Sequence, residues 1–294
     1  MKILTRGVLI LAVASGLLGP CKAQTSPTDP TVAGQFVDVE GSKLYFEECG
    51  AGPDAVVLIH DGIAHSAVWD LVWPVFCKQF HVIRYDRRGY GRSPAATTWY
   101  SETDDLAVLL HSRNIRRASL VGSSHGGELS IDFTLQYPGL VKQLVLVGAV
   151  VSGFPYTDHF LNRGMKNSEP FEKGDVPKGL ANWSKDRYLL APVHEAAQKQ
   201  LLAILTASPQ DMTHNDFVRP AKPALPRLSE IRIPTLILVG DADIPDVHAH
   251  AGAIEAGIGG SKRVVITDAG HLMYLEKPEE FSRVVIGFLQ LNAE

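Results

Sequence analysis

Short continuous runs of hydrophobic residues alternate along this chain with longer stretches of mixed polarity. Runs such as Ala55–Ile59 have no polar face, which is typical of strands that helices cover on both sides. The first two runs flank Glu40-Gly41-Ser42 and predict an antiparallel hairpin. We predict eight strands, at residues 36–39, 43–47, 55–59, 82–85, 118–121, 143–147, 235–239 and 263–267.

Helical patterns lie between most of these runs. Ser101, with Asp104 three residues later, resembles a capping box and predicts a helix that ends near residue 112. Further helices are expected through Trp69, Leu71 and Phe76, from residue 129 to Tyr137-Pro138, around 248–258, and over 278–291. Such alternation predicts an α/β fold with a mostly parallel sheet and helices on both faces.

The alternation stops between residues 152 and 229. This stretch has no strand-like run, includes a helical pattern at 193–205, and ends in a proline-rich segment. We therefore predict a helical cap at 152–229, inserted into a core domain formed by residues 34–151 and 230–294.

The first residues have a different character. Two basic residues precede the apolar run 7–18, and small residues at 21 and 23 suit cleavage before Gln24. The run is short for a transmembrane helix, which needs about 20 apolar residues. We expect a secretory signal at residues 1–23, with an uncleaved anchor and a lipoprotein as alternatives, although Pro20 before the cysteine disfavours lipidation.

The composition and net charge of the chain bear on its location and on its binding partners. The chain has 294 residues, of which 45% are hydrophobic and 20% charged, as in ordinary globular proteins. Loss of the signal leaves 25 basic against 32 acidic residues, a formal net charge of −7, which favours neither nucleic acid nor an anionic membrane. Residues 24–33 resemble a flexible tether. We expect an exported protein, periplasmic or secreted, without stable membrane association.

Cys49 and Cys77 remain after the signal. An even number of cysteines is compatible with an oxidising compartment. In the predicted fold, one cysteine ends the second strand and the other ends the first helix. A disulfide between them is therefore a hypothesis, and two buried free thiols are its alternative.

Candidate chemistry centres on Gly122-x-Ser124-x-Gly126, which lies between a predicted strand and a predicted helix. In a nucleophile elbow, the serine occupies a turn so sharp that the residues two positions away must lack a β-carbon. Ser123 lacks these flanking glycines, with Val121 and His125 in their places. Ser124 is therefore the candidate nucleophile.

A serine hydroxyl needs a base and, behind it, an acid. In a parallel sheet these residues should follow the carboxyl ends of strands. Gly240-Asp241-Ala242-Asp243 follows one strand, and Asp268-Ala269-Gly270-His271 follows the next. The order Ser124, Asp243, His271 suits a catalytic triad, and Asp241 is an alternative acid.

These motifs together resemble the α/β-hydrolase superfamily, in particular serine carboxylesterases and enol-lactone hydrolases. The resemblance covers the chain from the first hairpin to the last helix. It implies an eight-stranded sheet with a helical cap, and matches the catalytic residues to Ser124, Asp243 and His271. It also indicates that the Asp-x-Arg-Gly-x-Gly-x-Ser pattern at 86–93 is structural.

The resemblance also implies an oxyanion hole. One amide is that of His125, and the other comes from His60-Asp61-Gly62, where relatives commonly have His-Gly-x. Gly62 is our choice of donor and Ile63 the second, while Asp61 either points away or tunes the pocket. For the substrate pocket we expect Ile63, Trp69 and Met273. Further candidates for the pocket are Trp73, Tyr90, Phe154 and Trp183.

The expected reaction is hydrolysis of a small-molecule ester or lactone through an acyl-enzyme. A serine at the elbow disfavours the relatives that use a carboxylate nucleophile, such as epoxide hydrolases. A carbon–carbon bond hydrolase with the same triad and a non-catalytic binding protein are the alternatives. We expect no cofactor, because no dinucleotide or phosphate loop is present, and no metal, because His248 and His250 lack ligand spacing.

Overall fold

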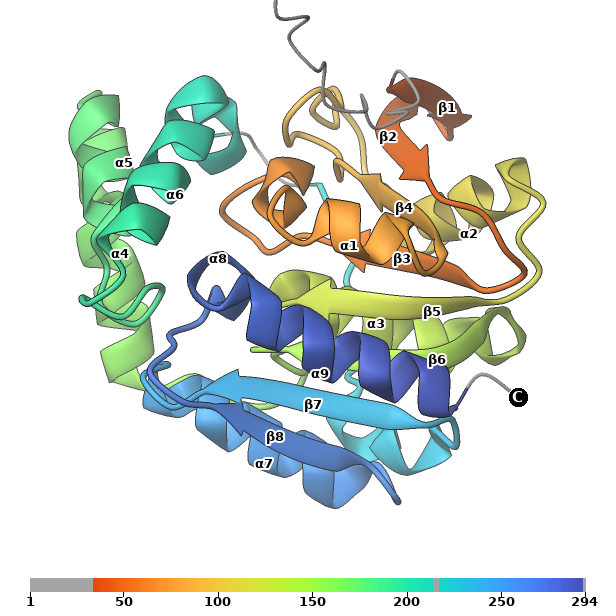
Figure 1. Ribbon diagram of the computed structural model, residues 1–294. Coiled ribbons are helices and arrows are strands. Elements are labelled where there is room, and N and C mark those ends of the chain that lie inside the picture. The colour runs from red at the N-terminus through yellow and green to blue at the C-terminus, as the bar shows by residue number, and fades with distance from the viewer. Residues whose placement is uncertain (1–33, 214–216, 293–294) are drawn as a thin grey trace, which may run out of the picture.

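The computed structural model describes residues 34–213 and 217–292, so the expected signal and tether lie outside the described residues. Its centre is an eight-stranded sheet in the order β1-β2-β4-β3-β5-β6-β7-β8 (Figure 1). The strands are β1 (Gln35–Val39), β2 (Ser42–Cys49), β3 (Ala55–Ile59), β4 (His81–Tyr85), β5 (Ala118–Ser123), β6 (Val141–Val147), β7 (Thr235–Gly240) and β8 (Lys262–Ile266). Strand β2 pairs antiparallel with β1 and β4, and the remaining pairs are parallel. The predicted α/β fold is confirmed.

Helices cover both faces of the sheet. They are α1 (Trp73–Cys77), α2 (Glu102–Ser112), α3 (His125–Gln136), α4 (Asp158–Glu172), α5 (Val176–Ser184), α6 (Glu195–Ala207), α7 (Pro245–Gly257), α8 (Met273–Glu276) and α9 (Pro278–Leu291). In Figure 1, α1 and α9 lie in front of the sheet and α2, α3 and α7 behind it. The predicted single helix through Trp69 and Phe76 is instead a 3₁₀ turn at Ser66–Trp69 followed by α1, which has Pro74 in its first turn.

The continuous apolar runs produce two separate cores, because successive side chains of a strand point to opposite faces. Val56 and Leu58 belong to the core under α1 and α9, whereas Val57 and Ile59 belong to the core under α2, α3 and α7. All four side chains are essentially inaccessible to solvent. Burial on both faces therefore explains the absence of a polar position in this strand.

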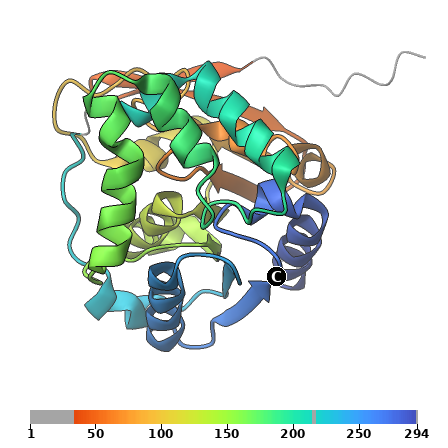
Figure 2. The same ribbon diagram turned by 90° about the vertical axis from the view of Figure 1, so that its left-hand side faces the viewer.

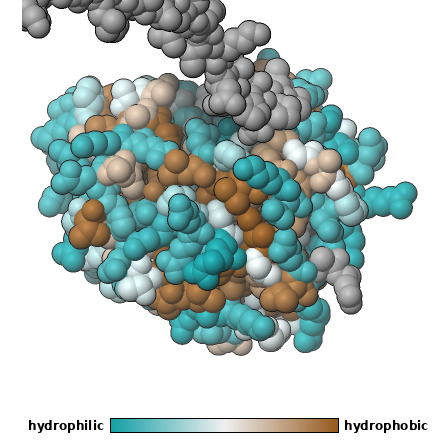
Figure 3. Space-filling view, viewed as in Figure 1, coloured by the Kyte–Doolittle hydropathy of each residue, from teal (hydrophilic) through white to brown (hydrophobic). Residues whose placement is uncertain are grey.

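The last helix shows how the sheet is closed on one side. Phe281, Val285 and Leu289 recur every four residues of α9 and are buried against the sheet, as expected for one stripe of a helix. In the same view as Figure 1, hydrophilic residues alternate with apolar ones on this face (Figure 3). Leu71, just before α1, and Val75, within α1, are among the exposed apolar residues. No helix in the described ranges is long and apolar enough to cross a bilayer.

Helices α4, α5 and α6 follow β6 and precede β7. Figure 2 shows them lying across one end of the sheet, above the carboxyl ends of the parallel strands. Arg163 on α4 pairs through two nitrogens with Asp186, at 2.7 and 2.9 Å. The loops after the strands, where the candidate catalytic residues lie, therefore face these three helices.

A disulfide joins Cys49 to Cys77, whose Cα atoms are 5.4 Å apart. The first cysteine ends β2 and the second ends α1. The disulfide hypothesis is thus correct, and the alternative of two free thiols is wrong. The bond links the sheet to its covering helix.

Candidate active site

Ser124 lies between β5 and α3 in a backbone conformation that is rare for a residue with a side chain. Its φ is 52° and its ψ is −116°, and such strain recurs at functional turns. A β-carbon at Gly122 would lie 2.2 Å from the carbonyl oxygen of Gly126. One at Gly126 would lie 2.4 Å from the carbonyl oxygen of His60. These backbone contacts leave no room for a β-carbon at either position, which explains why glycines flank Ser124.

His271 and Asp243 are in direct contact beside the cavity that Ser124 also lines. Nδ1 of His271 lies 2.7 Å from Oδ2 of Asp243 and both side chains are buried. Since a carboxylate only accepts hydrogen bonds, Nδ1 carries the hydrogen and Nε2 is left as the acceptor. Burial lowers the pKa of His271, but the charge and hydrogen bond of Asp243 outweigh it and raise this pKa above the usual 6.5.

The alternative acid, Asp241, has different partners. Its carboxylate accepts a hydrogen bond from the Ala269 amide at 3.3 Å, and so holds the turn after β8. The carboxylate of Asp243 also accepts the Ile244 amide at 2.7 Å. The geometry therefore places Asp243, and not Asp241, against His271.

Glu276 holds the loop that carries His271, a role that no sequence pattern indicated. One of its oxygens accepts the Gly270 amide and the other the Ala191 amide, each at 2.6 Å. The His271 amide donates to the Tyr188 carbonyl at 2.8 Å. Burial raises the pKa of Glu276 to about 7, although both amides oppose the shift. The loop is thus attached to the segment between α5 and α6.

Ser124, Asp243 and His271 line one cavity of about 130 Å³. Most of the other side chains around it are apolar and come from both the core and α4–α5. They are Ile63, Val150, Phe160, Trp183, Leu189, Ile244 and Val247, with Asp61, Gly62 and Arg163 completing the lining. The cavity therefore combines three convergent polar side chains with an apolar wall, as small-molecule sites do.

The structure corrects part of the expected pocket. Ile63 and Trp183 line the cavity, whereas Trp69 and Met273 do not. Both are fully buried in the core on the α9 side of the sheet, and the Trp69 ring lies 4.2 Å from that of Tyr274. The chain turns inward at Ser66–Trp69 and again at α8, so these large side chains fill the core. Trp73, Tyr90 and Phe154 also lie outside the cavity lining.

The two expected oxyanion donors lie next to each other. A β-carbon built on Gly62 would lie 3.6 Å from Cβ of His125. Within the described part of the chain, neither backbone amide has a hydrogen-bond acceptor. The Ile63 amide, our second choice, donates to Oδ1 of Asp61 at 2.7 Å. Ile63 is therefore already engaged, which leaves Gly62 as the available donor.

Asp61 lines the cavity, and both oxygens of its carboxylate already accept hydrogen bonds. Oδ1 accepts the amides of Ile63 and Ala64, and Oδ2 accepts the Tyr274 hydroxyl at 3.0 Å. Tyr274 also contacts Oγ of Ser123 at 3.1 Å. The carboxylate thus holds the turn after β3 in shape. The sequence offered no signal for Tyr274, which is 213 residues away.

The polar side chains of the Asp-x-Arg-Gly pattern, Asp86 and Arg88, form hydrogen bonds with nearby loops and with α2. Oδ1 of Asp86 accepts the Ser66 amide at 2.9 Å, and Oδ2 accepts the Arg92 amide at 2.9 Å. Arg88 forms a two-nitrogen pair with Asp105 of α2, at 2.6 and 2.7 Å. These contacts agree with the structural role expected of this pattern.

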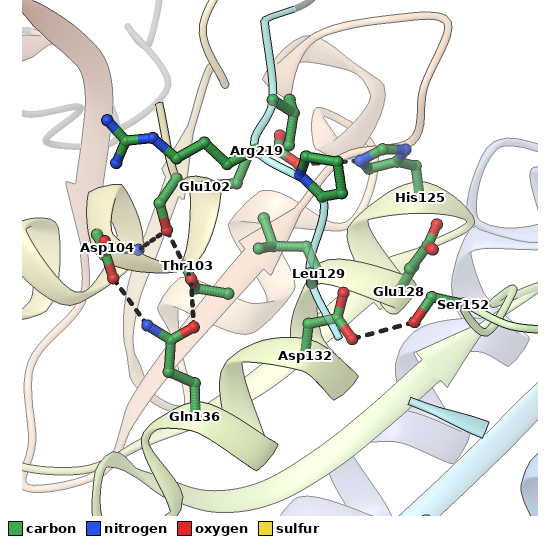
Figure 4. Close-up of a pocket in the computed structure, with 14 residues that line it drawn as sticks. Glu102, Thr103, Asp104, His125, Glu128, Leu129, Asp132, Gln136, Ser152 and Arg219 are labelled. Atoms are coloured by element: carbon green, nitrogen blue, oxygen red, sulfur yellow. Dashed lines mark hydrogen bonds and ion pairs between the residues drawn. The ribbon is translucent and has the colours of Figure 1, made fainter. Parts of the chain in front are cut away.

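A second cavity, of about 470 Å³, has His125 in its lining (Figure 4). Its lining is rich in carboxylates, including Glu102, Glu128 and Asp132. Burial and the nearby Glu128 raise the pKa of Asp132 to about 7. Ser124 does not line this cavity, and no group of three possible ligands in the described ranges could hold a metal ion. The smaller cavity is therefore the candidate active site.

Comparison with known proteins agrees with this geometry. The sequence profile of the "Alpha/beta hydrolase family" matches residues 56–284. A 2-hydroxy-6-oxononadienedioate/2-hydroxy-6-oxononatrienedioate hydrolase of Escherichia coli K12 is 27% identical, over 90% of this chain and 98% of the relative.

Two solved structures extend the comparison. An N-acyl homoserine lactone degrading enzyme, Est816, is 26% identical, with a TM-score of 0.67 over 86% of this chain and 100% of the other. A thermophilic esterase from Thermogutta terrifontis is 25% identical, with a TM-score of 0.73 over 89% of this chain and 98% of the other. The similarity extends over nearly the whole described fold.

The contact between His271 and Asp243 predicts an observable titration. We expect the imidazole of His271 to titrate above pH 6.5, and Asp243→Asn to lower this pKa by at least about one unit, because the neighbouring negative charge is lost. Proton NMR of the histidine ring signals measures both values. Asp241→Asn is the matched control and should leave the pKa of His271 unchanged. An equal shift in both variants would contradict the assignment.

Proposed function

Because this chain belongs to the alpha/beta hydrolase family, we propose that it is a serine hydrolase that cleaves a small carboxylic ester or lactone through an acyl-enzyme intermediate. Ser124 is the nucleophile, His271 the base and Asp243 the acid that orients it. The observation that carries the proposal is the single cavity lined by all three side chains. His271 keeps Nε2 as a proton acceptor because Asp243 occupies Nδ1.

Acylation begins when Nε2 of His271 takes the proton of Ser124 as Oγ bonds to the substrate carbonyl carbon. The π electrons of the carbonyl move to its oxygen, which the Gly62 and His125 amides receive. Loss of one such donor typically raises the barrier by about 3 to 4 kcal/mol. Both amides lack another acceptor in the described chain, so they are available when the negative charge develops.

The tetrahedral intermediate collapses as the leaving alcohol oxygen takes the proton from His271, and Ser124 keeps the acyl group. Deacylation then repeats these steps with water. Water loses a proton to His271 as its oxygen bonds to the acyl carbon, which forms a second tetrahedral intermediate. This intermediate collapses as the bond to Oγ of Ser124 breaks and Oγ takes the proton back from His271, which releases the acid and restores both residues. For a lactone, the leaving alcohol and the acid belong to one opened molecule.

The size of the cavity limits the acyl group. At about 130 Å³, it is close to an engineered apolar cavity of about 150 Å³ that holds benzene. An acyl group of about six carbons or fewer fits such a space. Phe160 of α4 and Trp183 of α5 form part of its apolar wall.

Carbon–carbon bond hydrolysis is the second candidate, supported by the similarity to the Escherichia coli hydrolase, whose named substrates are oxo-dicarboxylates and not esters. Two observations favour the ester or lactone. The cavity is small for a long dicarboxylate. Arg163, the cationic side chain in the lining, is already paired through two nitrogens with Asp186, which reduces its attraction for a substrate carboxylate.

We also propose that the protein is exported and that its signal is removed before Gln24. The supporting observations are the basic and apolar pattern of residues 1–23 and the disulfide between Cys49 and Cys77. Disulfides of this kind persist in oxidising compartments such as the periplasm.

Replacement of Ser124 tests the chemistry. Ser124→Ala should lower kcat for p-nitrophenyl acetate by at least about 10³-fold, because the nucleophile is lost, and should abolish labelling by a fluorophosphonate probe. Ser123→Ala is the matched control: Ser123 is buried against Tyr274 and the variant should keep labelling and most of its turnover. Wild-type turnover in Ser124→Ala would refute the mechanism.

A substrate panel tests the size of the pocket. We expect kcat/KM to be highest for p-nitrophenyl esters with acyl chains of two to about six carbons and to fall steeply for longer chains. Phe160→Ala should shift the optimum to longer chains, because it enlarges the cavity. Lactones and a vinylogous diketone complete the panel, and a diketone turned over much faster than every ester and lactone would favour the second candidate.

The mass of exported protein tests the proposed location. Intact-mass spectrometry of protein recovered from the periplasm or the medium should give a chain that begins at Gln24 and is two hydrogens lighter than its reduced form. A chain that keeps residues 1–23, or one with two free thiols, would contradict the proposal.

A further inference from the structure

The Gly62 amide, one of the two proposed oxyanion donors, shares a peptide unit with the carbonyl of Asp61. That carbonyl oxygen accepts two hydrogen bonds, from Nη2 of Arg87 at 2.7 Å and from Nδ1 of His60 at 2.8 Å. Because a peptide unit is planar, holding its oxygen fixes the direction of its N–H. A guanidinium on the oxygen also polarises the amide, so its hydrogen carries more positive charge.

The protonation of His60 follows from its partners. Nδ1 faces a carbonyl oxygen and must donate, while Nε2 accepts the Arg87 amide at 3.0 Å. His60 is therefore a neutral imidazole. Complete burial and the charge of Arg87 hold its pKa well below the usual value, in agreement with this arrangement. The cation on the Asp61 carbonyl is Arg87 alone.

Glu102 connects Arg87 to the second oxyanion donor. One carboxylate oxygen lies 2.9 Å from Nη1 of Arg87. The other lies 2.9 Å from Nε2 of His125, and Figure 4 shows Glu102 and His125. The side chains of Arg87 and Glu102 are only 3% and 10% exposed. The His125 ring, which is 38% exposed, is the outer end of this chain of contacts.

We propose that Arg87 and Glu102 are positioning residues for the oxyanion hole, Arg87 through the Asp61–Gly62 peptide and Glu102 through the ring of His125. The inference rests on the proposed function, since it needs a reaction that develops an oxyanion. Neither side chain touches the substrate cavity. They act by fixing where two backbone amides point, and this matters because catalysis loses much of its rate when donors are misplaced by about 1 Å.

The charge of Arg87 keeps the carboxylate of Glu102 ionised. Burial opposes ionisation of Glu102, but Arg87 and His125 outweigh it and lower the pKa of Glu102 to about 2. Burial and Arg87 favour neutral His125, yet Glu102 raises the pKa of its ring. Because the carboxylate stays ionised at neutral pH, both of its contacts persist while the enzyme turns over.

The neighbouring Arg88–Asp105 pair offers a matched comparison. It joins the same loop to the same helix α2, is equally buried, and has two hydrogen bonds of 2.6 and 2.7 Å. Neither residue contacts Gly62 or His125. Loss of this pair therefore reports the structural cost of breaking a buried ion pair here, without any effect on the oxyanion donors.

The test compares Glu102→Gln with Asp105→Asn in the purified protein. We expect Glu102→Gln to lower kcat by roughly 10- to 100-fold, with KM changed by less than about threefold, because only transition-state binding is lost. Asp105→Asn should lower thermal stability but keep kcat within about twofold. Equal losses of kcat in both variants, or an unchanged kcat in Glu102→Gln, would overturn the proposal.

A trifluoromethyl ketone with the preferred acyl chain gives a second readout. Its carbonyl carbon bonds to Oγ of Ser124, the serine proton passes to His271, and the carbonyl π electrons become an oxyanion in the hole. Its inhibition constant should therefore rise in Glu102→Gln by about the factor that kcat/KM falls, and stay unchanged in Asp105→Asn. An unchanged inhibition constant in Glu102→Gln would overturn the proposal.

Two variants of His125 test the outer contact if Glu102→Gln does not fold. His125→Ala keeps the backbone amide but loses the bond to Glu102, and should lower kcat with little change in KM. His125→Gln can donate to Glu102 again and should recover most of kcat. Equal kcat in His125→Ala and the wild type would overturn the proposal.

Ser124→Ala, measured in parallel, distinguishes failure of this proposal from failure of the proposed function. Full turnover in Ser124→Ala would refute the proposed function, and this proposal with it.

Discussion

The site depends on how closely α3 approaches the end of β3. A β-carbon on Gly126 would lie within 2.5 Å of the carbonyl oxygens of Ile59 and His60, so only glycine permits this contact. The approach brings the first amide of α3 beside Gly62 and forces Ser124 into its strained turn. One packing constraint therefore sets both the nucleophile and the oxyanion donors, and a change in it would move all three together.

Buried carboxylates hold the loops around this contact. Asp61, Asp86, Asp243 and Glu276 each accept at least one backbone amide from a loop after a strand. In a low-dielectric interior such charged hydrogen bonds are strong when all partners are present and costly when one is missing. This makes the loops rigid without regular secondary structure. Rigidity there is useful, because preorganised donors need not reorient as the oxyanion forms.

The sequence predicted the sheet, and the three polar side chains that meet at one cavity, better than it predicted the apolar lining of that cavity, for a physical reason. Continuous apolar runs and the glycines around Ser124 are local signals, and each reflects a contact within a few residues or a repeating strand environment. Trp69 and Met273 were placed wrongly because a large apolar side chain suits a core and a pocket equally well. Nothing local distinguishes the two, and the inward turn at Ser66–Trp69 decides the outcome. Tyr274 was missed because its partner Asp61 is remote in sequence.

The proposed catalytic groups all come from the core, whereas the apolar wall of the cavity comes from the core and from the helices that follow β6. The proposed triad and oxyanion donors follow β3, β5, β7 and β8, whereas Phe160 and Trp183 come from α4 and α5. The two parts meet through Glu276, which bonds both Gly270, beside His271, and Ala191, in the segment before α6. A substitution in the apolar wall can therefore change which acyl group fits while the acid–base geometry stays intact. A shift of the segment around Ala191 would alter both, because the same carboxylate anchors the loop of His271.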